Sequence, residues 1–185
     1  MDAADLHLAE YSAMRATIAQ RGTARMILVP VTFVAWAATA IATAAVITVA
    51  MSTLVPLMVL AAGFEAIFAL HVNVERIGRY LQVFHEPDGG WEHVAMEFSR
   101  RFRGGGPDPL FARLFGIAVS VNYLPVALTG EITEMVVLAI LHLILIYRIR
   151  SARVFASAQR EVDLQRFREL AAVAAPTPAS STPHE

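Results

Sequence analysis

The sequence contains no cysteine and no lysine among its 185 residues. Without cysteine the chain cannot form disulfides, thiolate zinc sites, iron–sulfur clusters or a cysteine nucleophile. All 15 strongly basic side chains are arginines, and the formal net charge of −1 lacks the basic excess that nucleic-acid binding requires. We therefore expect no nucleic-acid partner, and any metal site would have to use histidine and carboxylate side chains.

Catalytic motifs are missing as well. The chain has no glycine-rich phosphate-binding loop, no His-Glu-x-x-His run and no Gly-x-Ser-x-Gly elbow. Glycines cluster at 89–90 and 104–106, but neither cluster follows a predicted strand. We expect no catalytic residues, no metal site and, by default, no cofactor.

Long apolar segments dominate what is present. Four of them occupy residues 26–50, 54–72, 110–128 and 132–147. Each approaches or exceeds the ~20 residues with which a helix crosses the bilayer core. The sequence therefore predicts an all-α integral membrane protein, with an antiparallel four-helix bundle in residues 26–149.

The arginines predict the orientation of these segments. They precede the first segment, lie between the second and the third, and follow the fourth, whereas residues 51–53 and 129–131 contain none. Cytoplasmic loops of membrane proteins are enriched in arginine and lysine. We therefore expect a multi-pass protein of the plasma (inner) membrane with both termini in the cytoplasm.

Amphipathic stretches surround the apolar segments. Residues 1–25 predict a cytoplasmic N-terminal helix, and residues 150–173 predict a cytoplasmic C-terminal helix that packs on it. The second apolar segment continues as an amphipathic helix to residue 84. Residues 91–103 predict a short helix in the central loop, and the tail at 174–185 is expected to be disordered.

The loop helix carries aromatic side chains on one face and arginines on the other. This pattern is typical of a helix that lies in the membrane interface, where arginines meet anionic headgroups of the lipid bilayer. The residues expected at the interface are Trp91, Phe98, Arg100, Arg101, Phe102 and Arg103.

The first apolar segment has a stripe of small side chains. Ala35, Ala38, Ala42 and Ala45 follow one another at three- and four-residue steps. Small residues allow transmembrane helices to approach closely. We expect this stripe to pack the first helix inside its own bundle.

Glu65 is the clearest ionisable residue in an apolar segment. Counting ~1.5 Å per residue from Arg76 places it roughly 16 Å below the cytoplasmic boundary. Trp36 lies at the same depth counted from Arg25, and Asn122 is somewhat shallower, so these polar side chains are expected to meet in the bundle centre. Such a cluster either holds helices together through a neutral carboxyl group or responds to protons.

His71 and His142 form a second candidate site. Both are expected about 8–9 Å below the same boundary, on different helices. Two level histidines are what axial ligation of haem b requires, and Arg76 and Arg79 could meet the propionates. The alternative places His71 at the interface and bonds His142 to a neighbouring helix, without haem.

A weaker pattern combines His71 with Glu75, four residues further along one helical face. Histidine and carboxylate side chains from the loop could complete a zinc or iron site there. Those loop residues are His85, Glu86, Asp88 and His93. An ion pair between Glu75 and Arg79 is the simpler expectation.

These features favour a non-enzymatic membrane protein that binds a membrane or cytoplasmic protein partner, or acts as an accessory subunit, through its cytoplasmic amphipathic layer. The inference is by elimination, because the amphipathic surfaces are conspicuous and a catalytic constellation is not. The alternatives are a redox subunit with haem b between His71 and His142, and a small proton-coupled transporter or channel centred on Glu65. The chain could also form oligomers.

Overall fold

A computed structural model describes residues 2–46, 49–86, 88–102, 108–129 and 131–174. The predicted all-α class is confirmed for this part of the chain. Its elements are α1 (Ala3–Val46), the 3-10 turn η1 (Ala50–Thr53), α2 (Leu54–Phe84), α3 (Trp91–Arg101), α4 (Ala112–Thr129) and α5 (Ile132–Ala174). By length and composition α1, α2 together with η1, and α5 can each cross a membrane, whereas α4 is apolar but shorter.

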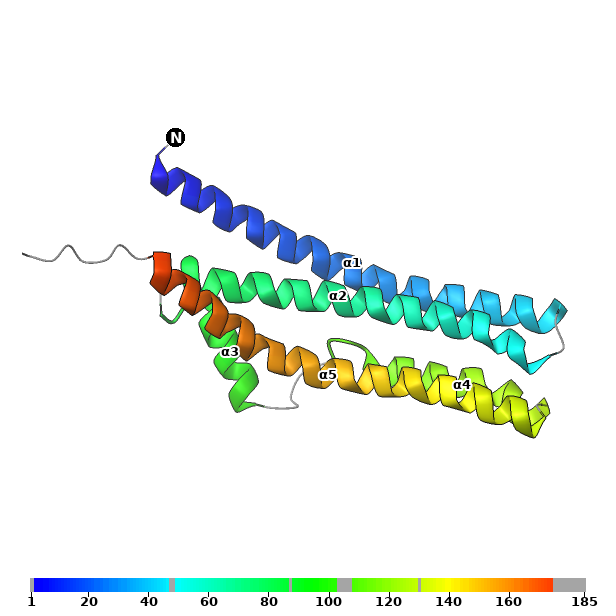
Figure 1. Cartoon of the computed structure of the whole chain (residues 1–185). Coiled ribbons are helices and arrows are strands. Elements are labelled where there is room, and N and C mark those ends of the chain that lie inside the picture. The colour runs from blue at the N-terminus through cyan, green and yellow to red at the C-terminus, as the bar shows by residue number, and fades with distance from the viewer. Residues whose placement is uncertain (1, 47–48, 87, 103–107, 130, 175–185) are drawn as a thin grey trace, which may run out of the picture.

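The long helices lie side by side, with α2 between α1 and α5 (Figure 1). The chain runs in opposite directions along α1 and α2, and again along α4 and α5. The helix α4 packs on α5 and α2, and α3 packs on α2. The start of α1 and the end of α5 therefore lie at the same end of the molecule, close to α3.

Two of the expected helix boundaries do not exist. Residues 1–25 were expected to form a helix separate from the first apolar segment, yet α1 continues without a break from Ala3 to Val46. Residues 150–173 likewise continue the fourth apolar segment as part of α5. Gly22 and Pro30 lie on either side of the first junction without ending α1, and residues 147–153 at the second junction contain neither glycine nor proline.

The C-terminal part of α5 packs on α2, not on the N-terminal part of α1 as expected. The ring of Phe167 lies 5.7 Å from that of Tyr80 and 6.3 Å from that of Phe84, centroid to centroid. Tyr80 also donates a hydrogen bond of 2.7 Å to Glu10 on the other side of α2. The extension of α2 thus separates the two helices that the sequence had suggested would touch.

Two buried aromatic rings and a partly buried one fix the level of α1, α2 and α4 relative to one another. The ring of Phe115 lies 5.2 Å from Phe33 and 5.3 Å from Phe64. Beside them α1 and α2 approach so closely that a Cβ atom built on Gly63 would lie 2.8 Å from the Cβ of Thr32 and closer still to both of its γ atoms. Glycine is required at this contact because no side chain fits between the helices.

The alanine stripe of α1 was expected to face the bundle, and most of it does not. Ala38, Ala42 and Ala45 are exposed, and Ala35 is half-buried. In the most apolar 18-residue stretch of α1 only 6% of the residues are buried, compared with 33% in the corresponding stretch of η1 and α2. The outer part of α1 is therefore held mainly through residues on its other face.

The contact at Gly63 gives a first prediction. Gly63→Ala should lower the free energy of unfolding by roughly 1–3 kcal/mol, because the added methyl group must push α1 away from α2. Gly116→Ala is the matched control, since a Cβ atom there has nothing within 4 Å, and it should be neutral or slightly stabilising. Thermal unfolding in mild detergent, followed by circular dichroism, measures both, and equal stability of the two variants would contradict the close approach.

Candidate functional site

Glu65 does not meet Trp36 and Asn122. Its side chain is 46% exposed, and its Oε2 lies 2.7 Å from Nη2 of Arg148 on α5. The guanidinium group of Arg148 also lies over the ring of Phe68, with Cζ 4.7 Å from the centroid. The expected buried carboxyl group is therefore a surface ion pair that sets α2 and α5 level with each other.

Glu65 lies away from Asn122 because α2 does not begin at the end of the molecule. The Nδ2 of Asn122 donates a 3.0 Å hydrogen bond to the carbonyl oxygen of Thr53, immediately before α2. Asn122 itself lies about 10 Å inside the end of α4 at Thr129. The start of α2 therefore lies about 10 Å inside the molecule, level with Asn122. Glu65 lies correspondingly further from the end of the molecule formed by Thr129.

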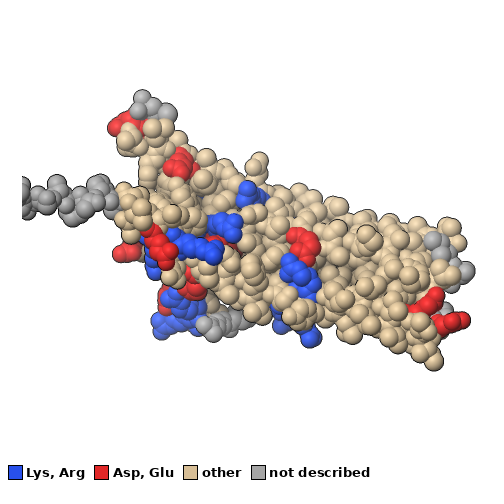
Figure 2. Space-filling model, in the orientation of Figure 1, with Lys and Arg blue, Asp and Glu red and all other residues tan. Residues whose placement is uncertain are grey.

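The Glu65–Arg148 pair divides the molecule into two parts. We call the part that contains Thr32–Val46, residues 49–53, Leu54–Phe64, α4 and residues 131–147 the apolar half, and the other described residues the charged half. In the space-filling view, charged side chains gather over the charged half, and the opposite end is tan apart from a small acidic group at its tip (Figure 2). From Ile132 to Arg148 the apolar half measures about 24 Å, and α4 measures about 27 Å.

Asn122 joins four elements inside the apolar half. Its Oδ1 accepts a 3.1 Å hydrogen bond from the indole nitrogen of Trp36 on α1, and its Nδ2 bonds the Thr53 carbonyl and His142 of α5. Asn122 and His142 are 5% and 3% exposed. The structure thus brings Trp36 and Asn122 together, with His142 in the place expected for Glu65.

The two histidines do not face a common haem in this structure. Because the Asn122 amide donates to Nε2 of His142 at 3.0 Å, the ring proton sits on Nδ1, which donates to the Leu138 carbonyl at 2.7 Å. The Nδ1 of His71 lies 3.1 Å from Nη1 of Arg25. Thr53 and His142 both bond Asn122, and His71 is about 27 Å from Thr53 along α2. The two histidines are therefore far apart along the bundle.

The arginines expected at the haem propionates have acidic or amide partners instead. Arg76 pairs with Asp163 at 3.2 Å, and Arg79 pairs with Glu92 at 3.2 Å and donates to Gln82 at 2.8 Å. The Glu75–Arg79 pair suggested by the sequence is replaced by Glu75 with Arg160 of α5, at 2.8 Å. Within the described residues, no group of three or more His, Cys, Asp or Glu side chains is placed to hold a metal ion.

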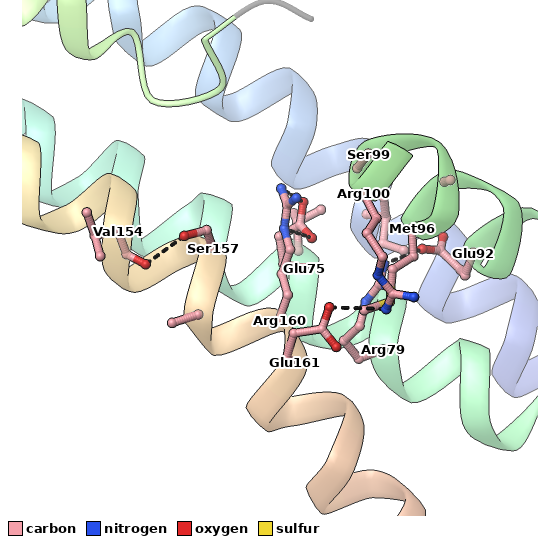
Figure 3. Close-up of a pocket in the computed structure, with 15 residues that line it drawn as sticks. Glu75, Arg79, Glu92, Met96, Ser99, Arg100, Val154, Ser157, Arg160 and Glu161 are labelled. Carbon is pink, nitrogen blue, oxygen red and sulfur yellow. Dashed lines mark hydrogen bonds and ion pairs between the residues drawn. The ribbon is translucent and has the colours of Figure 1, made fainter. Parts of the chain in front are cut away.

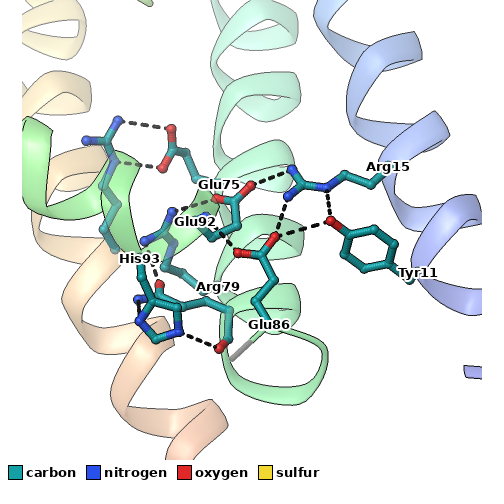
Figure 4. A network of polar contacts seen from close by, with 9 residues as sticks. Tyr11, Arg15, Glu75, Arg79, Glu86, Glu92 and His93 are labelled. Atoms are coloured by element: carbon teal, nitrogen blue, oxygen red, sulfur yellow. Dashed lines mark hydrogen bonds and ion pairs between the residues drawn. The ribbon is translucent and has the colours of Figure 1, made fainter. Parts of the chain in front are cut away.

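A polar junction joins α1, α2 and α3 in the charged half, and we define it as Arg15, Arg79, Glu86 and Glu92 (Figure 4). Glu92 binds Arg15 at 2.8 Å and Arg79 at 3.2 Å. Glu86 binds Arg15 as well, and its Oε2 accepts a 2.7 Å hydrogen bond from the backbone nitrogen of Glu92. Two arginines and two carboxylates are thus balanced, and a side chain rather than water caps the start of α3.

Gly78 makes room for this junction. A Cβ atom on Gly78 would lie 2.7 Å from Oε2 of Glu92, so any other residue would displace the carboxylate. The side chain of Glu92 is 10% exposed, and that of Arg79 is 6% exposed. Sequence reasoning missed the junction because it joins residues far apart in the chain; a glycine inside an otherwise strong helical pattern was the one available signal.

The junction turns the acidic side of α3 inward and its aromatic face outward. Glu92 and Met96 are buried, whereas the apolar residues predicted on one face are largely exposed to the surroundings. Their exposed fractions are 69% for Trp91, 54% for Val94, 60% for Phe98 and 55% for Phe102. Arg100 and Arg101 are exposed too, and Arg103 lies outside the described residues.

The two ends of α3 contact different long helices. Glu92 lies against Gly78, which is about 20 Å beyond Glu65 along α2. Arg100 pairs at 3.3 Å with Glu161, which is about 20 Å beyond Arg148 along α5. In Figure 1, α3 crosses the long helices obliquely.

A cavity of about 600 Å³ lies between α3, α2 and α5 (Figure 3). Its wall carries acidic and basic side chains that pair with one another, including Glu75 with Arg160 and Glu92 with Arg79. The Nε of Arg79 is buried and has no acceptor among the described residues. The paired charges give this cavity no excess of one sign.

His85 lies at the tip of α2, where the first turns of α1 cover it. Its side chain is 1% exposed, its ring lies 4.1 Å from that of His7, and its Nε2 is 3.6 Å from Glu10. Burial lowers the pKa of His85 below its ordinary value, and the neighbouring His7 lowers it further against the opposing effect of Glu10. His85 is therefore neutral at pH 7, between His7, Glu10, Tyr11 and Tyr80.

Comparisons with protein-family models, with curated proteins and with solved structures gave no match. The site is therefore defined by its geometry: a balanced polar junction that fixes α3, and an aromatic face that α3 presents outward.

The junction predicts unequal effects for two glutamates on α3. Glu92→Gln should destabilise the docking of α3 toward the lower end of the roughly 3–5 kcal/mol seen when a buried ion pair loses one partner, because Arg15 stays partly exposed. Glu97→Gln is the control, since Glu97 is exposed and pairs only with Arg100 nearby. Hydrogen exchange of the α3 amides should accelerate in the first variant alone; equal protection in both would contradict the role of Glu92.

The environment of His85 predicts a loss of packing in acid. A base whose pKa is lowered on folding contributes its full stability above its unfolded pKa of about 6.5, and this contribution is lost as the pH falls below that value. The protection factors of the amides in the first turns of α1, which correct for the slower intrinsic exchange in acid, should therefore fall on going from pH 7.5 to pH 5. His85→Phe, which keeps a ring beside His7 and Tyr80, should reduce this dependence, and an unchanged pH profile would rule out His85 as its source.

Proposed function

We propose that this chain is a multi-pass protein of the plasma membrane, with both termini in the cytoplasm, that binds a protein partner through the exposed aromatic face of α3. The four helices of the apolar half form an antiparallel membrane bundle in this proposal. The charged half is its cytoplasmic layer, and no enzymatic step is required. The observation that carries the proposal is the outward aromatic face of α3, held about 20 Å from the Glu65–Arg148 pair.

The length of the apolar half supports a membrane boundary at the Glu65–Arg148 pair. Its 24–27 Å, estimated from about 1.5 Å per helical residue, fits a hydrocarbon core of about 30 Å, with Arg113 and Arg148 reaching the headgroups. A membrane boundary at Arg76 would lengthen the membrane-spanning part by about 16 Å and would place Arg113 and Arg148 in hydrocarbon. The arginine distribution then favours a cytoplasmic charged half, because the tip of the apolar half carries only acidic charge, at Glu131 and Glu134.

This boundary separates α3 from the lipid. Headgroups extend only about 5–8 Å beyond the hydrocarbon core, and interfacial helices bury their apolar face within that region. At about 20 Å, α3 lies beyond the headgroups in water. Four large apolar side chains that are each more than half exposed to water are typical of a protein interaction site, and aromatic residues are enriched at the centre of such sites.

Photo-crosslinking in membranes tests the proposal at three exposed positions. A photoreactive amino acid at Phe98 should yield adducts with protein, whereas one at Met58, which is 71% exposed in the apolar half, should yield adducts with lipid. The third position, Asn73, lies about 12 Å beyond Glu65 along α2 and should give no lipid adduct.

The same experiment separates the alternatives. Lipid adducts at both Phe98 and Asn73 would move the boundary to Arg76 and make α3 an interfacial helix, which would overturn the proposal. Protein adducts at Phe98 that persist after Trp91→Ala and Phe102→Ala would also count against a docking face. Leu170→Ala is the matched control, because Leu170 is 59% exposed in the same layer but lies outside α3.

A further inference from the structure

We infer that the headgroup phosphate of an anionic phospholipid binds Arg21 and Arg25 of α1, beside α2. The inference rests on the proposed function for the position of the membrane boundary at the Glu65–Arg148 pair. Its own evidence is different. These two arginines are partly buried cations, and the described part of the chain supplies no counter-charge for either of them.

Arg21 and Arg25 differ in this respect from the other arginines that the structure describes. Each of the others either pairs with a carboxylate, as Arg15, Arg79 and Arg160 do, or is exposed. Water can solvate the unpaired arginines that are exposed, which are Arg101, Arg113, Arg150 and Arg168. A partly buried guanidinium group is solvated less well, so it requires an anion.

Arg25 is held in place without being neutralised. Among the described residues it makes a single hydrogen bond, from Nη1 to Nδ1 of His71, at 3.1 Å. An arginine can only donate, so Nδ1 is unprotonated and the His71 ring is neutral. The Nε of Arg25 is buried and has no acceptor among the described residues. The contact with His71 therefore orients the guanidinium group, and its charge still lacks a partner.

The surrounding sequence offers no free carboxylate. No aspartate or glutamate occurs between Glu10 and Glu65, and Glu75, one turn beyond His71, is paired with Arg160. Arg21 and Arg25 are four residues apart, so they are neighbours on one face of α1, with Cβ atoms about 5–6 Å apart. Two guanidinium groups at this spacing can both donate charge-assisted hydrogen bonds to the oxygen atoms of one phosphate.

The height of the two arginines identifies the source of the phosphate. Thr32 of α1 lies against Gly63 of α2, and counting along both helices from this contact places Arg25 about 8 Å beyond Glu65. Arg21 is about 6 Å further. With the hydrocarbon edge at Glu65, Arg25 lies at the outer side of the headgroup layer, and the long side chain of Arg21 can reach it. An anionic headgroup at this height supplies the missing charge.

Native mass spectrometry of the whole protein in mild detergent tests the site. The anionic probe is phosphatidylglycerol, and phosphatidylcholine with the same acyl chains is the zwitterionic one. The first phosphatidylglycerol molecule should bind more tightly than phosphatidylcholine. Arg21→Gln and Arg25→Gln should each weaken its binding by about tenfold, because each removes a charge-assisted contact. Arg25→Lys keeps the charge and should lose less.

Two matched variants make the result specific. Arg168→Gln removes the same charge from an exposed arginine about 30 Å beyond Arg148 and should leave binding unchanged. Arg113→Gln removes an exposed arginine near the membrane boundary itself. An equal loss in that variant would indicate a diffuse attraction to all boundary arginines and would overturn the defined site. Arg21 has no bonded partner among the described residues, so thermal unfolding of Arg21→Gln should match that of the unmodified chain.

Unchanged lipid binding in Arg21→Gln and Arg25→Gln would contradict the inference. Displacement of the lipid by an equal concentration of inorganic phosphate would assign the site to a soluble phosphate compound and would overturn the lipid assignment. The proposed function is tested separately, because photo-crosslinks at Phe98 and Asn73 report position relative to the membrane and not headgroup charge. Lipid adducts at both of those positions would remove the proposed function and, with it, the argument from height.

Discussion

The burial of Glu92 between Arg15 and Arg79 is the interaction on which the charged half depends. A carboxylate removed from water is costly unless it is paired and hydrogen-bonded, and here two arginines from two helices pair with it. Its backbone nitrogen is bound by Glu86, so the connection from α2 to α3 is closed by the same group of side chains. One side of α3 is thereby fixed against α1 and α2, so its aromatic side faces outward.

The apolar half follows a different constraint. Asn122 binds side chains or backbone of α1, η1 and α5, which ties the helices together through three hydrogen bonds of modest strength. Thr53 lies inside the apolar half because its carbonyl oxygen accepts one of the hydrogen bonds of Asn122. The turn before α2 is thus drawn in from the end of the molecule, and this shift sets where Glu65, Gly78 and finally α3 lie.

The sequence predicted well the features that depend on local pattern. It predicted poorly the features that depend on how far one helix is shifted along another. Apolar length located the helices, and similar distances from Arg25 and Arg113 placed Trp36 near Asn122. Glu65 was misplaced because its depth was counted from Arg76, and nothing in the sequence indicates that α2 starts inside the bundle. Periodicity identified the aromatic face of α3, but a period does not say whether a face points inward or outward. That direction is decided by Gly78 and Arg15, residues of other helices.

The unbroken course of α1 has a mechanical consequence. Its tightest contact with α2, at Thr32 and Gly63, divides it into an arm of about 21 Å toward Val46 and an arm of about 44 Å toward Ala3. A helix that pivots there as one body acts as a lever, and a small sideways shift of the end of the short arm moves the end of the long arm about twice as far in the opposite direction. Arg15 lies on the long arm, so a tilt in the apolar half pulls directly on the carboxylates that hold α3.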